Sequence, residues 1–313
     1  MSGWFSIVQK YVFLARIQDQ SPKHVYRFPP IISERLSRKN GRLLLRHLIH
    51  LNKPDLLNEY YAALADARFL AREIEKPKRV IDAARWKMWK RRMPLDYVLG
   101  WTPFGGMRIK IKPPVLIPRR ETEFWMERLL QEIPENSSVR VMEAGTGSGC
   151  ISIMLSKRRP AIRLMAIDIA PYALKLAKEN ATANGVEGHM EFRRANIFDE
   201  QSFRKDSYDL IISNPPYVPP SSRPTTMAPS VRKWESSMAT VGVGYTDGTN
   251  FHRRVIQLGS TLRSHRDQPR VAIELDGTVQ QLHAVVSHAG HFGFTKTRVI
   301  SDQNGHPRAL FLY

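Results

Sequence analysis

Short apolar runs alternate with helical stretches over the second half of this 313-residue chain. The runs have the length and the aliphatic content of buried strands, and most segments between them carry apolar residues at helical spacing. The strand-like runs are Val139–Glu143, Ile162–Ile167, Met190–Arg193, Tyr208–Ser213 and Val271–Leu275, and the helical stretches lie near 149–158, 171–184, 249–263 and 277–289. This order predicts an α/β domain with a mostly parallel sheet that carries helices on both faces.

Changes in composition divide the chain into four parts. Residues 1–28 form a distinct basic start, and residues 29–93 show the spacing of several short helices, which predicts a small helical bundle. Residues 94–122 are rich in Pro and Gly and predict a connector with a short hairpin around Phe104 to Ile111. Residues 123–313 form the α/β domain, and its last runs, 294–300 and 309–312, predict an antiparallel pair at one edge of the sheet.

A glycine-rich loop follows the first strand of the α/β domain. It reads Gly145-Thr146-Gly147-Ser148-Gly149 and leads directly into a helix. Glycines allow a tight turn and a close approach of the backbone to a ligand. The second strand ends at Asp168, nineteen residues after Gly149, where a carboxylate can accept hydrogen bonds from ribose hydroxyls. The pattern therefore predicts a nucleoside-containing cofactor, with a nicotinamide dinucleotide as the rival to S-adenosylmethionine.

The fourth strand ends in the sequence Asn214-Pro215-Pro216-Tyr217. The two prolines fix two φ angles and remove two backbone N–H donors. The side-chain carbonyl of Asn214 and the backbone carbonyl of Pro215 therefore have few hydrogen-bond donors nearby. Two acceptors beside the aromatic face of Tyr217 suit a planar –NH2 group. Ile197, after the third strand, lies where an adenine ring is expected. Together these segments indicate methyl transfer from S-adenosylmethionine to an amide or an exocyclic amine.

At this level of detail the chain resembles the HemK/PrmC-type release-factor glutamine methyltransferases. The resemblance runs from about Pro94 to the C-terminus and includes 94–100, 115–123, 145–149, 213–217 and 247–254. It implies a Rossmann-like class I S-adenosylmethionine methyltransferase domain, preceded by a helical domain that recognises the protein substrate. The implied substrate is the glutamine of the Gly-Gly-Gln motif of a release factor, which becomes N5-methylglutamine.

The same resemblance implies roles for individual residues. The implied substrate-binding and catalytic residues are Asn214, Pro215, Pro216 and Tyr217. The implied cofactor contacts are Gly145, Thr146, Gly147, Ser148, Gly149, Asp168, Ile197 and Asn214. The chain departs from the family pattern at Arg120 and Glu121, where Pro and Asp are usual, and at Asn196, where Asp is common. None of these departures changes the atoms that are expected to hold the amide.

The first 50 residues are basic and nearly free of acids. They contain nine Lys or Arg against two acids, Asp19 and Glu34, and apolar residues between Trp4 and Ala15 fall on one helical face. This pattern is typical of a mitochondrial transit segment. We therefore expect a mitochondrial matrix protein whose partner is a mitochondrial release factor, and monomer is the default state. No apolar run is long enough to span a bilayer.

The charge of the whole chain keeps two other functions open. Lys and Arg number 48 against 29 Asp and Glu, a net charge of +19, which favours anionic partners such as the ribosome or RNA. An adenine-N6 methyltransferase acting on RNA or DNA would use the Asn214–Tyr217 segment equally well. A non-catalytic, basic assembly factor would use the helical domain as an adaptor. The single cysteine, Cys150, excludes a disulfide framework.

Two further segments carry weaker signals. The connection 218–248 is long and rich in proline, and we interpret it as either a substrate lid, with Trp234 as a contact, or a solvated insertion. The spacing of His283, His288 and His291 does not place all three on one helical face, so no metal site is expected.

Overall fold

The computed structural model describes residues 91–199, 208–222, 225, 227–241, 247–262 and 268–313. The expected targeting segment, 1–28, and all but the end of the expected helical domain, 29–93, lie outside these residues, and both stay predictions. In the described part of the chain, no helix combines the length and the apolar character that crossing a bilayer requires.

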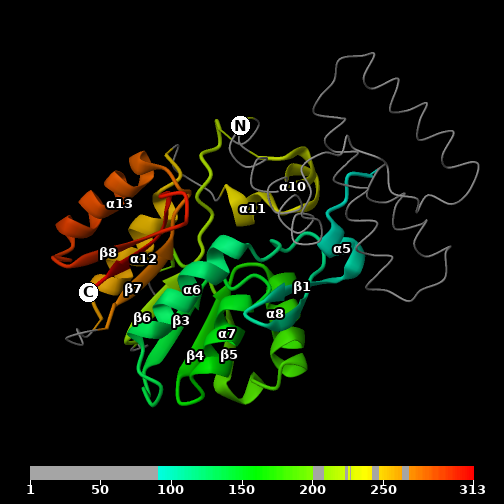
Figure 1. The fold of residues 1–313 in the computed structure, drawn as a ribbon, viewed down its shortest axis with the longest axis horizontal. Coiled ribbons are helices and arrows are strands. Elements are labelled where there is room, and N and C mark those ends of the chain that lie inside the picture. The colour runs from blue at the N-terminus through cyan, green and yellow to red at the C-terminus, as the bar shows by residue number, and fades with distance from the viewer. Residues whose placement is uncertain (1–90, 200–207, 223–224, 226, 242–246, 263–267) are drawn as a thin grey trace, which may run out of the picture. The chain divides into compact units, whose positions relative to one another are not determined.

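A seven-stranded sheet forms the centre of the described domain (Figure 1). Its order is β5-β4-β3-β6-β7-β9-β8; the first five strands are parallel, and β9 and β8 are added antiparallel at one edge. The strands are β3 Arg140–Ala144, β4 Arg163–Asp168, β5 Met190–Arg194, β6 Leu210–Ser213, β7 Val271–Glu274, β8 Thr297–Ser301 and β9 Pro307–Leu312. The predicted parallel sheet and its antiparallel edge are both confirmed.

Helices cover both faces of this sheet because its strands are apolar on both sides. On β9, for example, Phe311 packs in the cluster that contains Trp125 of α6, whereas Leu310 packs in the cluster that contains Val255 of α12. Figure 1 shows α6, α7 and α8 on one face and α12 and α13 on the other. The bounds are α6 Arg120–Glu132, α7 Cys150–Arg158, α8 Pro171–Ala183, η1 Glu187–His189, α12 Asn250–Ser260 and α13 Val279–His291.

The connector before the sheet is folded against α8. It contains α5 Leu95–Leu99 and an antiparallel hairpin of β1 Trp101–Phe104 and β2 Met107–Lys110, which turns at Gly105-Gly106. The Glu123 carboxylate accepts a hydrogen bond from Gly105 N at 3.0 Å, which ties the turn to α6. A small apolar cluster then joins the connector to α8; it comprises Tyr97, Ile111, Val115, Ile117, Ala173 and Leu176.

The connection 218–248, interpreted above as a substrate lid or a solvated insertion, has regular structure in part. It contains two short helices, α10 Pro229–Trp234 and α11 Ser237–Thr240, within its described residues. Pro229 occupies the first turn of α10, and the Ser236 hydroxyl accepts a hydrogen bond from Met238 N at the start of α11. Proline and serine at these positions favour helix starts, but the sequence analysis did not predict helices in this segment.

Close contact between α12 and the sheet depends on one glycine. A Cβ added at Gly259 would lie 2.1 Å from Val271 Cγ2, much nearer than carbon atoms can approach. Gly259 therefore lets α12 lie directly on β7, the strand that ends beside the site described below.

We expect Gly259→Ala to destabilise the domain. The added methyl must push α12 away from β7, and overpacking of this kind costs about 1–3 kcal/mol. Gly290→Ala in α13 is the matched control, because nothing lies within 4 Å of its added Cβ, and replacing a helical glycine by alanine stabilises by about 0.5–1 kcal/mol. Urea unfolding measures the free energy of unfolding, which should fall in Gly259→Ala and rise in Gly290→Ala. An unchanged free energy of unfolding in Gly259→Ala would contradict the close packing of α12 on β7.

Candidate active site

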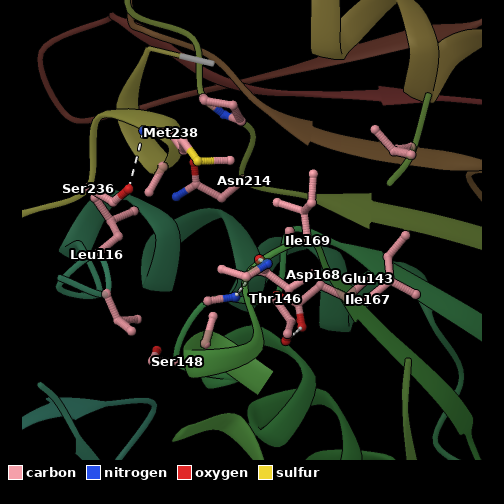
Figure 2. A pocket seen from close by; sticks show the side chains of 18 of the residues that line it. Leu116, Glu143, Thr146, Ser148, Ile167, Asp168, Ile169, Asn214, Ser236 and Met238 are labelled. Atoms are coloured by element: carbon pink, nitrogen blue, oxygen red, sulfur yellow. Dashed lines mark hydrogen bonds between the residues drawn. The ribbon is translucent and has the colours of Figure 1, made fainter. Parts of the chain in front are cut away.

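A cavity of about 420 Å³ opens at the carboxyl ends of β3, β4 and β6 (Figure 2). The chain runs outward in one direction through β3, β4 and β5 and then returns to the other side of β3 as β6. Such a switch point leaves a crevice between neighbouring loops, and its volume falls in the range of small-molecule sites. Figure 2 shows Asn214, Ser236 and Met238 on one side of the cavity and Thr146, Ser148 and Asp168 on the other.

The glycine loop forms one wall of the cavity. Gly145 N and Thr146 N both donate to Ile167 O at 2.9 Å, which fixes the loop to the end of β4. Gly145 and Gly147 have φ angles of 76° and 56°, in the left-handed region that favours glycine. Gly149 does not line the cavity. A Cβ there would lie 3.1 Å from Ala177 Cβ, so this glycine allows α7 to pack against α8.

Asp168 stands at the end of β4 beside this loop. Its carboxylate accepts hydrogen bonds from Gly147 N and Ala170 N, both at 2.9 Å. Burial raises the pKa of Asp168 above its usual value, while these two N–H groups act in the opposite sense. Because each carboxylate oxygen accepts more than one hydrogen bond, Asp168 can still accept from a ligand's hydroxyl groups.

A second carboxyl group, Glu143, lies beneath the loop and is 1% exposed. Its Oε2 accepts hydrogen bonds from the hydroxyls of Thr146, at 2.7 Å, and Ser152. Burial raises the pKa of Glu143 to about 7 despite these two donors. Cys150 at the start of α7 is also buried, and burial raises the pKa of its thiol. Its thiol is therefore protonated near neutral pH, and it packs as a small apolar residue.

Exposed apolar side chains line both sides of the cavity, with Ile169 next to Asp168 and Met238 across from it (Figure 2). Four of them are more than 40% exposed and line the cavity: Ile169, Tyr172, Phe198 and Met238. Ile197 lies beneath them and is buried, and Asn196 lines the cavity next to it. Large apolar groups exposed together around one cavity are typical of a ligand site.

These residues fit S-adenosylmethionine. Asp168 would hold the ribose hydroxyls, and the open backbone of Gly145 and Gly147 would lie against the amino-acid part. Ile197 and Phe198 would contact the adenine ring, with Asn196 as a polar neighbour. Among the described residues there is no group of three His, Cys, Asp or Glu side chains that could hold a metal ion.

Asn214 lines the cavity and is held from behind by two other elements. Its Nδ2 donates to Thr122 Oγ1 at 3.0 Å, and Thr122 Oγ1 lies 2.5 Å from Glu274 Oε2. Glu274 is the last residue of β7 and is 2% exposed. The register Ser213↔Ile273 places Asn214 and Glu274 next to each other at the ends of neighbouring strands.

The other residues of the Asn-Pro-Pro-Tyr segment take different positions. Pro216 lines the cavity, whereas Pro215 is buried beside it and Tyr217 is not among the lining residues. The Tyr217 hydroxyl donates to Glu274 Oε1 at 3.2 Å. Burial and the neighbouring Glu274 raise the pKa of Tyr217. The structure thus places the hydroxyl of Tyr217 in the network behind Asn214.

The connection after Tyr217 supplies part of the cavity wall. Ser236, Met238 and Ala239 line the cavity. The segment is fixed by a partly buried ion pair, in which Arg119 Nη2 lies 2.6 Å from both carboxylate oxygens of the buried Glu235. A backbone hydrogen bond from Ser236 N to Pro114 O, 2.8 Å, adds a second attachment. Trp234 packs against the connector and donates to Arg91 O at 2.9 Å, and it does not line the cavity.

Comparison with known proteins agrees with this geometry. A profile of the methyltransferase small domain matches residues 122–231. A release factor glutamine methyltransferase of Cereibacter sphaeroides is 34% identical over 219 residues, 70% of this chain and 74% of that protein. The relative from Geobacter sulfurreducens is 30% identical over 223 residues, 70% of this chain and 73% of its own length. The chain belongs to the release factor glutamine methyltransferase family.

Coverage of the relatives is partial. For the relative from Bacteroides thetaiotaomicron, 37% identical over 169 residues, the match spans 54% of this chain and 59% of that protein. Among solved structures, a methyltransferase from Pyrococcus furiosus aligns with a TM-score of 0.47 at 16% identity, over 66% of this chain and 89% of its own.

Five site residues of this family member were not predicted from the sequence. They are Thr122, Glu274, Glu143, Arg119 and Glu235. Glu143 and Glu274 carry the strongest signal, because a single acid within an apolar strand is rarely buried without a purpose. The Arg119–Glu235 pair joins residues 116 positions apart, and no local pattern identifies it. Arg120 and Glu121, the two departures from the family pattern, are exposed and do not line the cavity.

We expect Glu143 to make stability fall as the pH rises. The unfolded chain releases this proton near pH 4.5 and the folded chain near pH 7, so between these values the folded state holds the extra proton. Its stabilising effect is complete below about pH 4.5 and is lost as the pH rises to about 7.

Urea unfolding without cofactor between about pH 5 and pH 8 measures this effect. Glu143→Gln should remove roughly 2–3 kcal/mol of the fall in the free energy of unfolding. The amide oxygen of this variant would still accept from Thr146 and Ser152, and a smaller fall from Glu274, whose pKa burial raises to about 6, should remain. The same pH dependence in wild type and variant would show that Glu143 is ionised throughout.

Proposed function

We propose that this chain transfers a methyl group from S-adenosylmethionine to the side-chain amide nitrogen, N5, of the Gly-Gly-Gln glutamine of a mitochondrial release factor. The observation that carries the proposal is the state of the Asn214 amide. Its Nδ2 is bonded to Thr122, and among the described residues nothing donates to its Oδ1. A carbonyl without a donor, in the wall of a cavity that fits the cofactor, suits an incoming N–H group.

Asn214 and Pro215 would act by orienting a poor nucleophile. The lone pair of an amide nitrogen is delocalised into its carbonyl. Acceptors at Asn214 Oδ1 and the Pro215 carbonyl would hold both N–H bonds and stabilise the positive charge that develops on the nitrogen. Holding the nitrogen in line for attack contributes several kcal/mol more, as a rough figure. No general base is needed, because the methylated nitrogen is strongly acidic.

S-adenosylmethionine, when bound, supplies an electrophilic methyl group. The residues of this chain would bind it through Asp168 and the glycine loop and would exclude water with the apolar side chains of Ile169, Phe198 and Met238. Met238 belongs to the segment after Tyr217, so the wall that covers the cavity and the segment that holds the amide are continuous in sequence. We expect this continuity to couple substrate binding to closure of the cavity wall.

The mitochondrial location is part of the proposal and is supported by the basic, acid-poor start of the chain. The net charge of +19 supports a further contact with the ribosome or RNA. The protein would work in the matrix, where release factors and ribosomes are both present. The substrate class and the location are separable, and each has its own test.

Methyl transfer from labelled S-adenosylmethionine tests the substrate class. The substrates are a purified mitochondrial release factor, the same factor with Glu in place of the Gly-Gly-Gln glutamine, and matched RNA and DNA. We expect one methyl group, located by mass spectrometry, on the glutamine of the first substrate only. Label in adenine alone would overturn the proposal in favour of a nucleic-acid methyltransferase. Imaging of the full-length protein fused to a fluorescent tag at its C-terminus tests the location.

We expect Asn214→Ala to abolish most methyl transfer and to leave cofactor binding nearly unchanged. Loss of one preorganised polar group in a comparable site costs about 100- to 1,000-fold in kcat. Steady-state kinetics and the affinity for S-adenosylhomocysteine separate the two effects. Asn304→Ala, at an exposed position in the turn between β8 and β9, is the control. Full activity of Asn214→Ala would show that its carbonyl does not hold the substrate.

A further inference from the structure

The carboxylate of Glu274 is buried among donors that carry no charge. Its Oε2 accepts from Trp125 Nε1 at 2.6 Å and lies 2.5 Å from Thr122 Oγ1, and its Oε1 accepts from the Tyr217 hydroxyl. In the described part of the chain, no Lys or Arg forms an ion pair with it. Burying an acid without a cation is costly, so a purely structural role would be served better by an apolar residue.

Trp125 decides which way the hydrogen bonds run. An indole Nε1–H can only donate, so Glu274 Oε2 must be an acceptor. The ionised carboxylate has no proton of its own, so the Thr122 hydroxyl must donate to the same oxygen. With its proton used there, Thr122 Oγ1 can only accept from Asn214, which must present its Nδ2–H2 group. The carbonyl of Asn214 is left for the cavity.

We propose that Glu274 is a positioning residue that, through Thr122, holds the Asn214 amide with its oxygen toward the substrate and so selects a glutamine amide over a glutamate carboxylate. This inference rests on the proposed function and concerns the same site. A glutamine –NH2 group donates to Asn214 Oδ1. A glutamate carboxylate brings only acceptor oxygens to an acceptor, which leaves both groups unpaired and repels the ligand.

The hydrogen-bonded series Glu274–Thr122–Asn214, here called the relay, joins three separate elements. Glu274 ends β7, Thr122 and Trp125 lie one turn apart on α6, and Asn214 follows β6. Without Thr122 the amide of Asn214 could rotate by half a turn at little cost, because its oxygen and nitrogen have nearly the same shape. The rotated amide would present a donor and would favour the wrong substrate.

Thr122→Val and Thr122→Ser form the test pair. Valine has the shape of threonine without its hydroxyl, and serine keeps the hydroxyl. We measure the affinity of the S-adenosylhomocysteine-loaded protein for the release factor with Gln and with Glu at the Gly-Gly-Gln position. Thr122→Val should reduce the preference for Gln by about 10- to 100-fold, with little change in S-adenosylhomocysteine affinity. Thr122→Ser should restore most of the preference.

Glu274→Gln tests the origin of the polarity. Its amide can present N–H groups to Thr122, so we expect a loss of preference similar to that of Thr122→Val. If Thr122→Val lowers kcat but keeps the full Gln preference, Thr122 has a packing role only and the inference is overturned. Wild-type preference in Glu274→Gln would also overturn it.

A readout without substrate separates this inference from the proposed function. In 15N-labelled protein, the side-chain NH2 signal of Asn214, assigned by its absence in Asn214→Ala, should be protected from exchange with solvent. Protection should persist in Thr122→Ser and be lost in Thr122→Val and Glu274→Gln. Equal protection in all variants would overturn the relay. Absence of methyl transfer to glutamine by wild-type protein with a protected Asn214 amide would count against the proposed function alone.

Discussion

The buried carboxylate of Glu274 joins the elements that build the site. It ends β7, and the side chains bonded to it come from α6 and from the segment after β6. The donors to Glu274 are uncharged side chains, which bond to it only at short range. The hydrogen bonds therefore form only when α6, β7 and the segment after β6 are all packed in place. The apolar packing of Trp125 against Phe311 places α6 over β9, with ring centres 6.5 Å apart, and brings its first turn to the carboxyl end of β6. Packing in the core thus determines the polarity of a surface cavity.

The site also requires that neighbouring elements approach each other closely, and glycines make this possible. A Cβ at Gly248 would lie 2.2 Å from the Tyr217 carbonyl oxygen, so this glycine lets the start of α12 reach the end of the Asn-Pro-Pro-Tyr segment. Gly149 likewise allows α7 to pack closely against α8. The partly buried Arg119–Glu235 ion pair fixes the segment after Tyr217 from the other side. The cavity walls are therefore held by contacts between residues that are distant in sequence.

Local patterns were sufficient to predict the sheet, the helices on both faces and the antiparallel edge, because strand and helix periodicities survive in a single sequence. They also predicted a site at the glycine loop, Asp168 and Asn214, which lie at strand ends that the topology brings to one edge, and these residues, apart from Gly149, line one cavity. They further predicted that Tyr217 lines the substrate pocket. In the structure Tyr217 does not line the cavity, and its hydroxyl donates to Glu274 instead. That contact, like the relay through Thr122, depends on which helix covers which strand end, and no local signal contains this information.

The proposed role of Asn214 is to receive the substrate amide on its carbonyl oxygen, which the hydrogen bonds from Glu274 through Thr122 hold in place. The decisive test is a crystal structure of the protein with S-adenosylhomocysteine and a glutamine-containing release-factor fragment. We predict the glutamine nitrogen at a hydrogen-bond distance of about 3 Å from Asn214 Oδ1 and from the Pro215 carbonyl, with Asn214 Nδ2 still on Thr122. A glutamine nitrogen outside this pair of acceptors, or an Asn214 amide that presents Nδ2 to the substrate, would rule out this role of Asn214.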